Sequence, residues 1–223
     1  MSERIALIAG ATGLVGRALV DVLLQNETYD RIKVLVRQVV PEWQQHERLQ
    51  QLVVDYDHLE RHAANLQAND VYCCLGTTIK QAGSQARMYE IDVTYPLRLA
   101  ELARQQGATH WLVVSAMGAD ASARIFYSRI KGELEQQLRT LGYPFLSIVQ
   151  PSLLLGKREQ FRAGERAAAV ASSVLSPLLR GNLAKYKPIQ AETVARAMYR
   201  LALELQRGTN VYTSSQLQQL GSE

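Results

Sequence analysis

Gly10-Ala11-Thr12-Gly13-Leu14-Val15-Gly16 is the stretch that decides the fold. It follows an apolar run over residues 4–9, typical of a buried strand, and precedes apolar residues at helical spacing up to Leu24. The first glycine permits a tight turn, the second lets a pyrophosphate approach the backbone, and the third lets helix and strand pack closely. The stretch therefore predicts a strand–turn–helix unit that binds a dinucleotide, with glycines used for packing alone as the alternative.

Strand-like and helix-like segments alternate along the chain on either side of this stretch. We expect strands at 4–9, 32–36, 52–54, 71–75, 111–114 and 145–149, and helices at 14–24, 84–106 and 124–141. Such alternation predicts a parallel sheet with right-handed crossovers and helices on both faces. The expected fold class is α/β: a Rossmann-like doubly wound parallel sheet with a small C-terminal substrate-side cap.

The length of 223 residues favours a single domain. We expect one NAD(P)-binding Rossmann domain over 1–223, with a nucleotide-binding core at 1–150 and a substrate-side cap at 151–223 that includes a helix at 191–206 and a strand at 210–213. The uncharged segment 167–179 is expected to lie over the nicotinamide end, as a lid or pocket wall, with a dimer contact as the alternative. The basic residues of 157–166 indicate either a solvated face or a contact with an acidic substrate or the nicotinamide-side phosphate.

Composition excludes several classes of protein. The formal net charge of +4, with its excess in residues 151–223, is weak for nucleic-acid binding, and an anionic ligand is enough to explain it. The N-terminus does not resemble a signal peptide, and no apolar run approaches the roughly 18 residues of a membrane span. Cys73 and Cys74 are adjacent, which gives no disulfide framework, and the histidines show no metal-site spacing. We therefore expect a cytoplasmic protein without a metal.

Two side chains near the expected strand ends suggest which dinucleotide is bound. Arg37 stands where a carboxylate would bind the ribose hydroxyls of NAD, and its guanidinium suits a 2′-phosphate. This favours NADP(H), with a solvated surface arginine as the alternative. Asp55 is placed to accept from the adenine amino group, with Tyr56 beside it; alternatively, Asp55 caps the following turn.

A second constellation indicates the chemistry. Tyr127 and Lys131 are four residues apart, on one face of a helix, and Ser115 ends the fifth strand at the sheet edge where ligands bind. A free phenol titrates near about pH 10, and a neighbouring ammonium favours the phenolate that general acid–base chemistry needs. Ser115 can polarise the carbonyl oxygen that Tyr127 protonates. These three residues are the predicted catalytic set.

The motifs together resemble those of the atypical short-chain dehydrogenases/reductases. The glycine pattern, Ser115 and Tyr127-x-x-x-Lys131 are in family order, and residues 74–78, 114–118, 131–133 and 151–156 are similar to the Tat-interacting-protein branch and its bacterial relatives. The resemblance implies an NADP(H)-binding Rossmann domain. The resemblance implies cofactor contacts from Thr12, Gly13, Leu14, Val15, Arg37, Leu75, Gly76, Thr77, Pro151 and Ser152. Gly10, Gly16, Asp55 and Tyr56, identified above, complete the predicted cofactor-binding set.

Two positions depart from the family pattern. An asparagine that organises a proton-relay water is replaced by Asp92, and an arginine before the proline after the sixth strand is replaced by Gln150. The expected function is an NADPH-dependent oxidoreductase that reduces a small carbonyl compound with the Ser115, Tyr127 and Lys131 triad. A non-catalytic NADP(H)-binding redox sensor is the alternative. A homodimer is an open expectation for its assembly.

Overall fold

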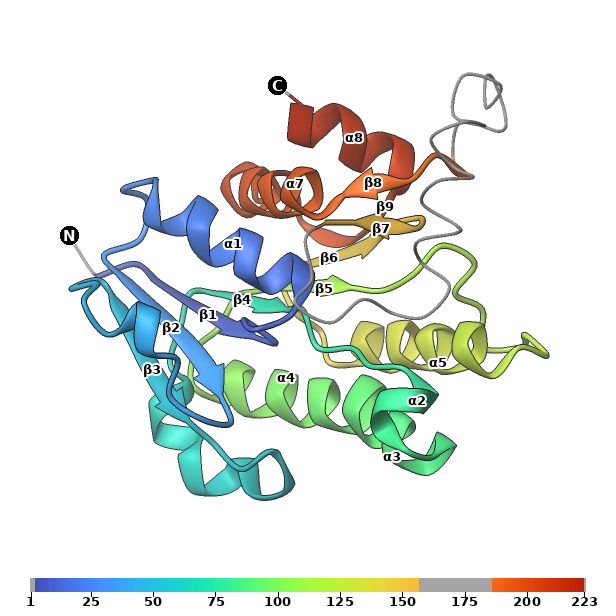
Figure 1. Cartoon of the computed structure of the whole chain (residues 1–223), viewed down its shortest axis with the longest axis horizontal. Helices are drawn as coiled ribbons and strands as arrows, with labels where there is room; N and C mark the ends of the chain where they lie inside the picture. The colour runs from blue at the N-terminus through green and yellow to red at the C-terminus, as the bar shows by residue number, and fades with distance from the viewer. Residues whose placement is uncertain (1–2, 157–185, 223) are drawn as a thin grey trace.

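The computed structural model describes residues 3–156 and 186–222, and its centre is a seven-stranded sheet with strand order β3-β2-β1-β4-β5-β6-β9 (Figure 1). Every neighbouring pair in this sheet is parallel. The strands are β1 (Ile5–Ala9), β2 (Arg31–Val36), β3 (Leu49–Val53), β4 (Asp70–Cys73), β5 (His110–Val114), β6 (Phe145–Gln150) and β9 (Gly208–Thr213). The expected Rossmann-like parallel sheet is confirmed.

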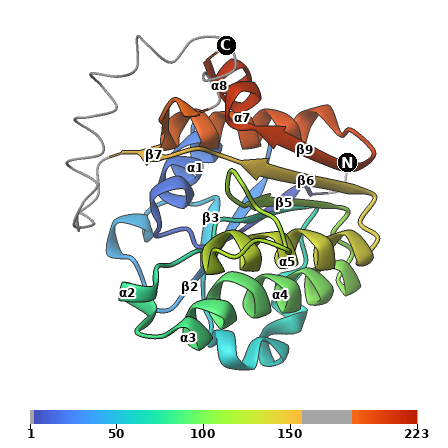
Figure 2. The ribbon, with the colours of Figure 1, turned by 90° about the vertical axis from the view of Figure 1, so that its right-hand side faces the viewer.

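Helices cover both faces of the sheet, which leaves two separate apolar cores (Figure 2). One face is covered by α1 (Leu14–Leu24), α7 (Ala191–Glu204) and α8 (Ser214–Ser222). The other is covered by α4 (Tyr95–Gln105), α5 (Phe126–Thr140) and the 3-10 segment η2 (Tyr56–Leu66). β1 is buried throughout and β2 is buried after its first residue, because helices cover both faces of these strands, whereas the edge strands β3 and β9 are partly exposed.

Short elements complete the described chain. They are the 3-10 turn η1 (Pro41–Trp43), the helices α2 (Ile79–Ala82) and α3 (Gln85–Tyr89), and the strands β7 (Leu154–Leu155) and β8 (Ile189–Gln190). β7 and β8 pair with each other in a separate parallel ribbon beyond β6. Sequence periodicity is not informative for elements this short, and of these five α3 alone lies within a predicted element, the helix at 84–106.

The long helix expected over 84–106 is present: α3, the π-helical turn η3 (Glu90–Thr94) and α4 follow one another without a gap from Gln85 to Gln105, with helical backbone angles at their junctions. The π-helical turn inside it was not predicted. Pro96 stands in the first turn of α4 and has no N–H to bond the carbonyl of Asp92. The Tyr95 N–H instead donates to the Glu90 carbonyl, five residues back, which is the π-helical pattern. The wider turn positions Asp92 in the interior, where it is fully buried.

The C-terminal part joins the main layers. β9 pairs in parallel with β6, from Phe145 opposite Gly208 to Gln150 opposite Thr213, and α7 packs on α1. The helix expected at 191–206 and the strand expected at 210–213 are therefore present as α7 and β9. We expected them in a separate cap, whereas β9 belongs to the main sheet and α7 to one of its helical layers. Residues 157–166 and 167–179, for which we predicted a basic contact and a lid, lie outside the described residues. No helix among the described residues is long and apolar enough to cross a membrane.

Candidate functional site

A cavity of about 1100 Å³ opens at the carboxyl edge of the sheet. It is lined by the segments that follow β1, β4, β5 and β6, and by side chains of α5 and of the helical turns before α4. Ligands bind at this edge of open α/β sheets because the strand ends and helix N-termini meet there. Of the predicted residues, the cavity is lined by Thr12, Gly13, Leu14, Val15, Leu75, Gly76, Thr77, Ser115, Tyr127, Lys131, Pro151 and Ser152.

The glycine turn has the shape that a dinucleotide phosphate needs. Gly10 has a φ of +76°, and a Cβ there would lie 2.5 Å from the Cys74 carbonyl oxygen. A Cβ on Gly16 would lie 2.2 Å from the Gly10 carbonyl oxygen, so this glycine permits the close contact of helix and turn. Gly13 is the N-cap of α1, with no capping side chain and no acidic residue in the first turn. The first N–H groups of α1 are therefore free of side-chain partners and fit a phosphate.

The three predicted catalytic side chains all line this cavity. Ser115 follows β5, while Tyr127 and Lys131 lie one turn apart on α5. The Lys131 Nζ lies 6.0 Å from the centre of the Tyr127 ring. Tyr127 is 42% exposed, whereas Ser115 and Lys131 are buried. All three residues predicted as catalytic thus line one cavity, and the Tyr127 phenol is the most exposed of them.

Lys131 has a buried carboxylate partner. Its Nζ lies 2.8 Å from Asp92 Oδ1, and the other carboxylate oxygen accepts from the Thr77 backbone N–H at 2.8 Å. Burial disfavours the ammonium, but Asp92 and, to a smaller extent, Tyr127 outweigh it, so the pKa of Lys131 is raised. Asp92 therefore replaces the expected relay asparagine with an ion pair that links α5 to the loop after β4.

Ser115 also has a buried carboxylate partner, which the sequence analysis missed. Its hydroxyl donates to Glu135 Oε1 on α5. Gln150 Nε2 donates to both oxygens of the same carboxylate, at 2.9 and 3.2 Å. Glu135 is four residues after Lys131, so the spacing that brought Tyr127 and Lys131 to attention could have found it.

Five predicted cofactor-binding residues do not line the cavity. Gly10 and Gly16 permit the close backbone contacts of the turn and do not line the cavity themselves. Arg37 is exposed directly after β2, and the described residues offer it no hydrogen bond or ion pair. The neighbouring cation Arg17, which does line the cavity, is paired with Glu42 at 2.6 Å. Among the described residues Arg37 is thus unpaired, in contrast to Arg17.

Asp55 and Tyr56, the other two, serve the local structure. Asp55 caps η2, because its Oδ1 accepts from the Asp57 N–H at 3.0 Å and its Oδ2 lies 2.7 Å from His58 Nδ1. Tyr56 is buried and stacks on Tyr95 with ring centres 5.4 Å apart. The alternative interpretation of Asp55 as a cap is confirmed. Contact of these two residues with adenine stays a prediction, which the burial of Tyr56 does not support.

Cys73 and Cys74 point to opposite faces of the sheet, as their adjacency predicts, and pack in the two different cores. Burial raises the pKa of the Cys73 thiol to about 11. Both cysteines are free thiols. In residues 3–156 and 186–222, no three His, Cys, Asp or Glu side chains gather as metal ligands would.

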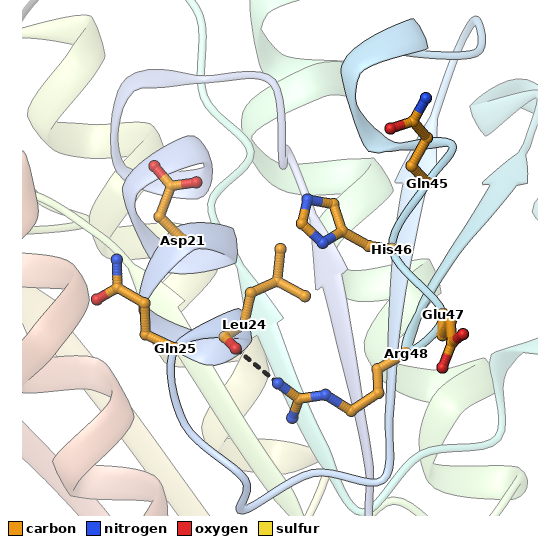
Figure 3. Close-up of a pocket in the computed structure, with 7 residues that line it drawn as sticks. All are labelled: Asp21, Leu24, Gln25, Gln45, His46, Glu47 and Arg48. Carbon is orange, nitrogen blue, oxygen red and sulfur yellow. Dashed lines mark hydrogen bonds between the residues drawn. The ribbon is translucent and has the colours of Figure 1, made fainter.

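A second pocket, of about 580 Å³, lies at the opposite edge of the sheet (Figure 3). It is formed by the end of α1 and the loop before β3, and Arg48 crosses it to donate to the Leu24 carbonyl at 2.6 Å. The same guanidinium also donates to the carbonyls of Asn26 and Tyr29. These bonds satisfy the backbone after α1, so Arg48 has a structural role in this pocket.

Comparison with known proteins defines the class to which this site belongs. Residues 6–136 match the NAD dependent epimerase/dehydratase family. The MoeE5 protein, solved in complex with UDP-glucose and NAD, has a TM-score of 0.67 at 17% identity, with 92% of this chain and 74% of that one covered. That likeness shows the fold. The chain belongs to the NAD dependent epimerase/dehydratase family, a class of NAD(P)-binding, oxidoreductase-type Rossmann proteins.

Relatives with higher sequence identity show to which branch of this family the chain is similar. The chain is 34% identical to Protein HTATIP2 of Rattus norvegicus over 167 residues, which cover 74% of this chain and 69% of the relative. It is 30% identical to Protein FMP52, mitochondrial, of Eremothecium gossypii over 159 residues, which cover 71% and 70%. These relatives confirm the resemblance to atypical short-chain dehydrogenases/reductases of the Tat-interacting-protein branch.

The relatives also correct one expectation. The cytoplasmic location predicted from the sequence is contradicted, because the fungal relatives are named as mitochondrial proteins. The prediction relied on the lack of a recognisable leader and of an apolar span. Neither feature distinguishes the cytoplasm from an organelle.

Proposed function

We propose that the protein is an NADPH-dependent oxidoreductase that reduces a small carbonyl compound. The observation that carries the proposal is the shared cavity: the glycine turn of a dinucleotide site and the side chains Ser115, Tyr127 and Lys131 line the same space. A cofactor-binding turn alone would fit a sensor as well as an enzyme. An acid–base side chain facing that turn is what hydride transfer to a carbonyl requires.

NADP(H) is the proposed cofactor, and bound NADPH would supply the hydride. Support comes from Arg37, which is exposed and free to pair with a 2′-phosphate just after β2. The next residues, 38–40, include no carboxylate that would repel such a phosphate. Glu42 is the nearest acidic residue along the chain, and Arg17 neutralises it.

Each member of the proposed triad has a distinct task. Tyr127, the accessible member, would donate the proton to the carbonyl oxygen. Lys131 would hold the cofactor ribose and favour the phenolate left after proton transfer, with Asp92 keeping the lysine charged. Ser115 would contact the substrate from the end of β5.

The proposal is tested by NADPH oxidation against a panel of aldehydes, ketones and quinones, with cofactor binding followed by fluorescence in parallel. Turnover of at least one class, with tighter binding of NADPH than NADH, is expected. Binding of NADPH without oxidation in the presence of any compound would favour the alternative, a non-catalytic redox sensor. One observation favours that alternative: Lys131 is already paired with Asp92, which weakens its influence on the phenol.

A further inference from the structure

Ser115 is a cavity-lining hydroxyl whose hydrogen is already in use. The residue is 3% exposed, lines the cavity, and donates its one hydrogen to Glu135 Oε1. A serine hydroxyl has one hydrogen to donate and two lone pairs that accept. With the hydrogen on Glu135, Ser115 offers the cavity lone pairs alone.

The other partners of Glu135 fix the direction of that bond. Gln150 Nε2 donates to both carboxylate oxygens, and the Arg139 guanidinium lies 3.9 Å from Oε2. An amide nitrogen and a guanidinium can donate and cannot accept. Each of these groups therefore donates toward the Glu135 carboxylate, which accepts. The same direction holds for the Ser115 hydroxyl, which donates to Oε1. Breaking the bond to Ser115 would leave a buried carboxylate with one donor fewer, which is costly.

The neighbouring side chain has the opposite polarity. Tyr127, Lys131 and Glu135 follow one another at spacings of four along α5, so they lie on one face of the helix. Tyr127 keeps a phenolic hydrogen to donate, whereas Ser115 can accept. The cavity is thus lined by both a hydrogen-bond donor, Tyr127, and a hydrogen-bond acceptor, Ser115. A carbonyl group without a neighbouring hydroxyl can pair with the donor alone.

We propose that Glu135 is a positioning residue that makes Ser115 a hydrogen-bond acceptor toward the cavity, so that the site selects hydroxycarbonyl compounds. In this arrangement, which builds on the proposed function, the carbonyl oxygen accepts from Tyr127 and the neighbouring hydroxyl donates to Ser115. Hydride passes from NADPH to the carbonyl carbon and the Tyr127 proton passes to its oxygen. The products are a diol and NADP⁺, and solvent returns a proton to Tyr127. The substrate hydroxyl is unchanged.

Hydroxyacetone and butanone test this selection, because they differ by a hydroxyl in place of a methyl group. Binding is measured by calorimetry in the presence of NADP⁺, which cannot reduce either ketone. We expect the wild-type protein to bind hydroxyacetone about tenfold more tightly, the effect of one hydrogen bond. Glu135→Met frees the Ser115 hydrogen, and Ser115→Ala removes the acceptor, so both variants are expected to lose this preference. Glu133→Met, the same change on the same helix, is expected to retain it.

A second measurement needs no ligand. In the wild-type protein the Ser115 hydroxyl proton is expected as a slowly exchanging NMR signal with contacts to Glu135, and that signal is expected to vanish in Glu135→Met and persist in Glu133→Met. In the binding experiment, the proposal is overturned if wild type binds both ketones equally or binds neither, or if Glu135→Met retains the preference for hydroxyacetone. In the NMR experiment, it is overturned if the Ser115 hydroxyl proton of the wild-type protein exchanges fast. Selective binding of hydroxyacetone without its reduction by NADPH would instead refute the proposed function and leave the selection intact.

Discussion

Lys131 Nζ lies 2.8 Å from Asp92 Oδ1, and neither side chain has more than 3% of its surface exposed. Removing one member of such a pair leaves an uncompensated buried charge. The same carboxylate also accepts from the Thr77 N–H, so it joins α5 to the loop that forms the floor of the cavity. Asp92 therefore contributes both to the stability of the fold and to the charge of Lys131.

Asp92→Asn is expected to destabilise the folded protein by about 3 kcal/mol, because Lys131 loses its counter-ion. Urea unfolding at neutral pH measures this loss. The matched control is Glu60→Gln, which removes a carboxylate from an exposed ion pair with Arg98 and is expected to cost less than about 1 kcal/mol. Equal losses of unfolding free energy in the two variants would show that the buried pair of Lys131 and Asp92 contributes no more to stability than the exposed pair of Arg98 and Glu60.

The contribution of the pair also predicts a pH dependence. The pKa of Lys131 is raised in the folded state, so this state holds its proton to higher pH than the unfolded chain does. The stabilisation is complete below the ordinary lysine pKa of about 10.4 and is lost as the pH rises through the folded value. Without Asp92, burial lowers the pKa of Lys131 in the folded variant, so the stability difference between wild type and Asp92→Asn should begin to shrink below about pH 10 and continue to shrink above it. A difference that grows with alkaline pH would contradict this sign.

Arg37→Asp is expected to weaken NADPH binding by about 1.5–3 kcal/mol, roughly 10- to 150-fold, with little effect on NADH. The reason is the loss of a charge-assisted pair with the 2′-phosphate. Arg31→Asp is the control, because Arg31 begins the same strand at the far edge and is paired with Glu3. Fluorescence titration with both cofactors checks the result, and equal weakening of NADPH and NADH would exclude a 2′-phosphate contact.

Tyr127→Phe is expected to lower the reduction rate by about 100-fold or more while NADPH affinity stays nearly intact, since the proton donor alone is lost. Lys131→Ala is expected to reduce both rate and affinity, because the ammonium serves ribose and phenol. Steady-state kinetics and cofactor titration on the same preparations separate the two effects. An activity that survives Tyr127→Phe unchanged would rule out this residue as the acid.

Gly16→Ala and Gly76→Ala form a contrasting pair. A Cβ at Gly16 would lie 2.2 Å from a backbone oxygen, whereas at Gly76 its nearest contact would be Asp92 Oδ1 at 3.6 Å. Alanine ordinarily favours a helix by about 1 kcal/mol, yet Gly16→Ala in α1 should destabilise by about 3 kcal/mol. Gly76→Ala should stay within about 1 kcal/mol of wild type. Thermal unfolding distinguishes these cases, and a stable Gly16→Ala would refute the close packing of the turn.

The seven strands of the main sheet, the glycine turn and the spacing of Tyr127 and Lys131 on one helix could be predicted, because each follows a short-range pattern: apolar runs, fixed glycine spacing, or a spacing of four on a helix. The sequence did not predict the π-helical turn before Pro96, which the missing N–H of this proline favours. The partners of the triad were also missed or left open. Asp92 and Glu135 reach Lys131 and Ser115 through tertiary packing, and their roles depend on distances that no local pattern encodes.

Hydride transfer from NADPH to a carbonyl carbon is tested most directly by an isotope label on the hydride. NADPH deuterated at C4, in each of its two stereochemical forms, is incubated with the protein and a carbonyl compound, and the alcohol is analysed by mass spectrometry. We expect deuterium at the carbinol carbon from one form and not the other, with the product strongly diminished in Tyr127→Phe. NADPH that binds to the protein while no deuterium reaches the alcohol from any aldehyde or ketone would contradict hydride transfer.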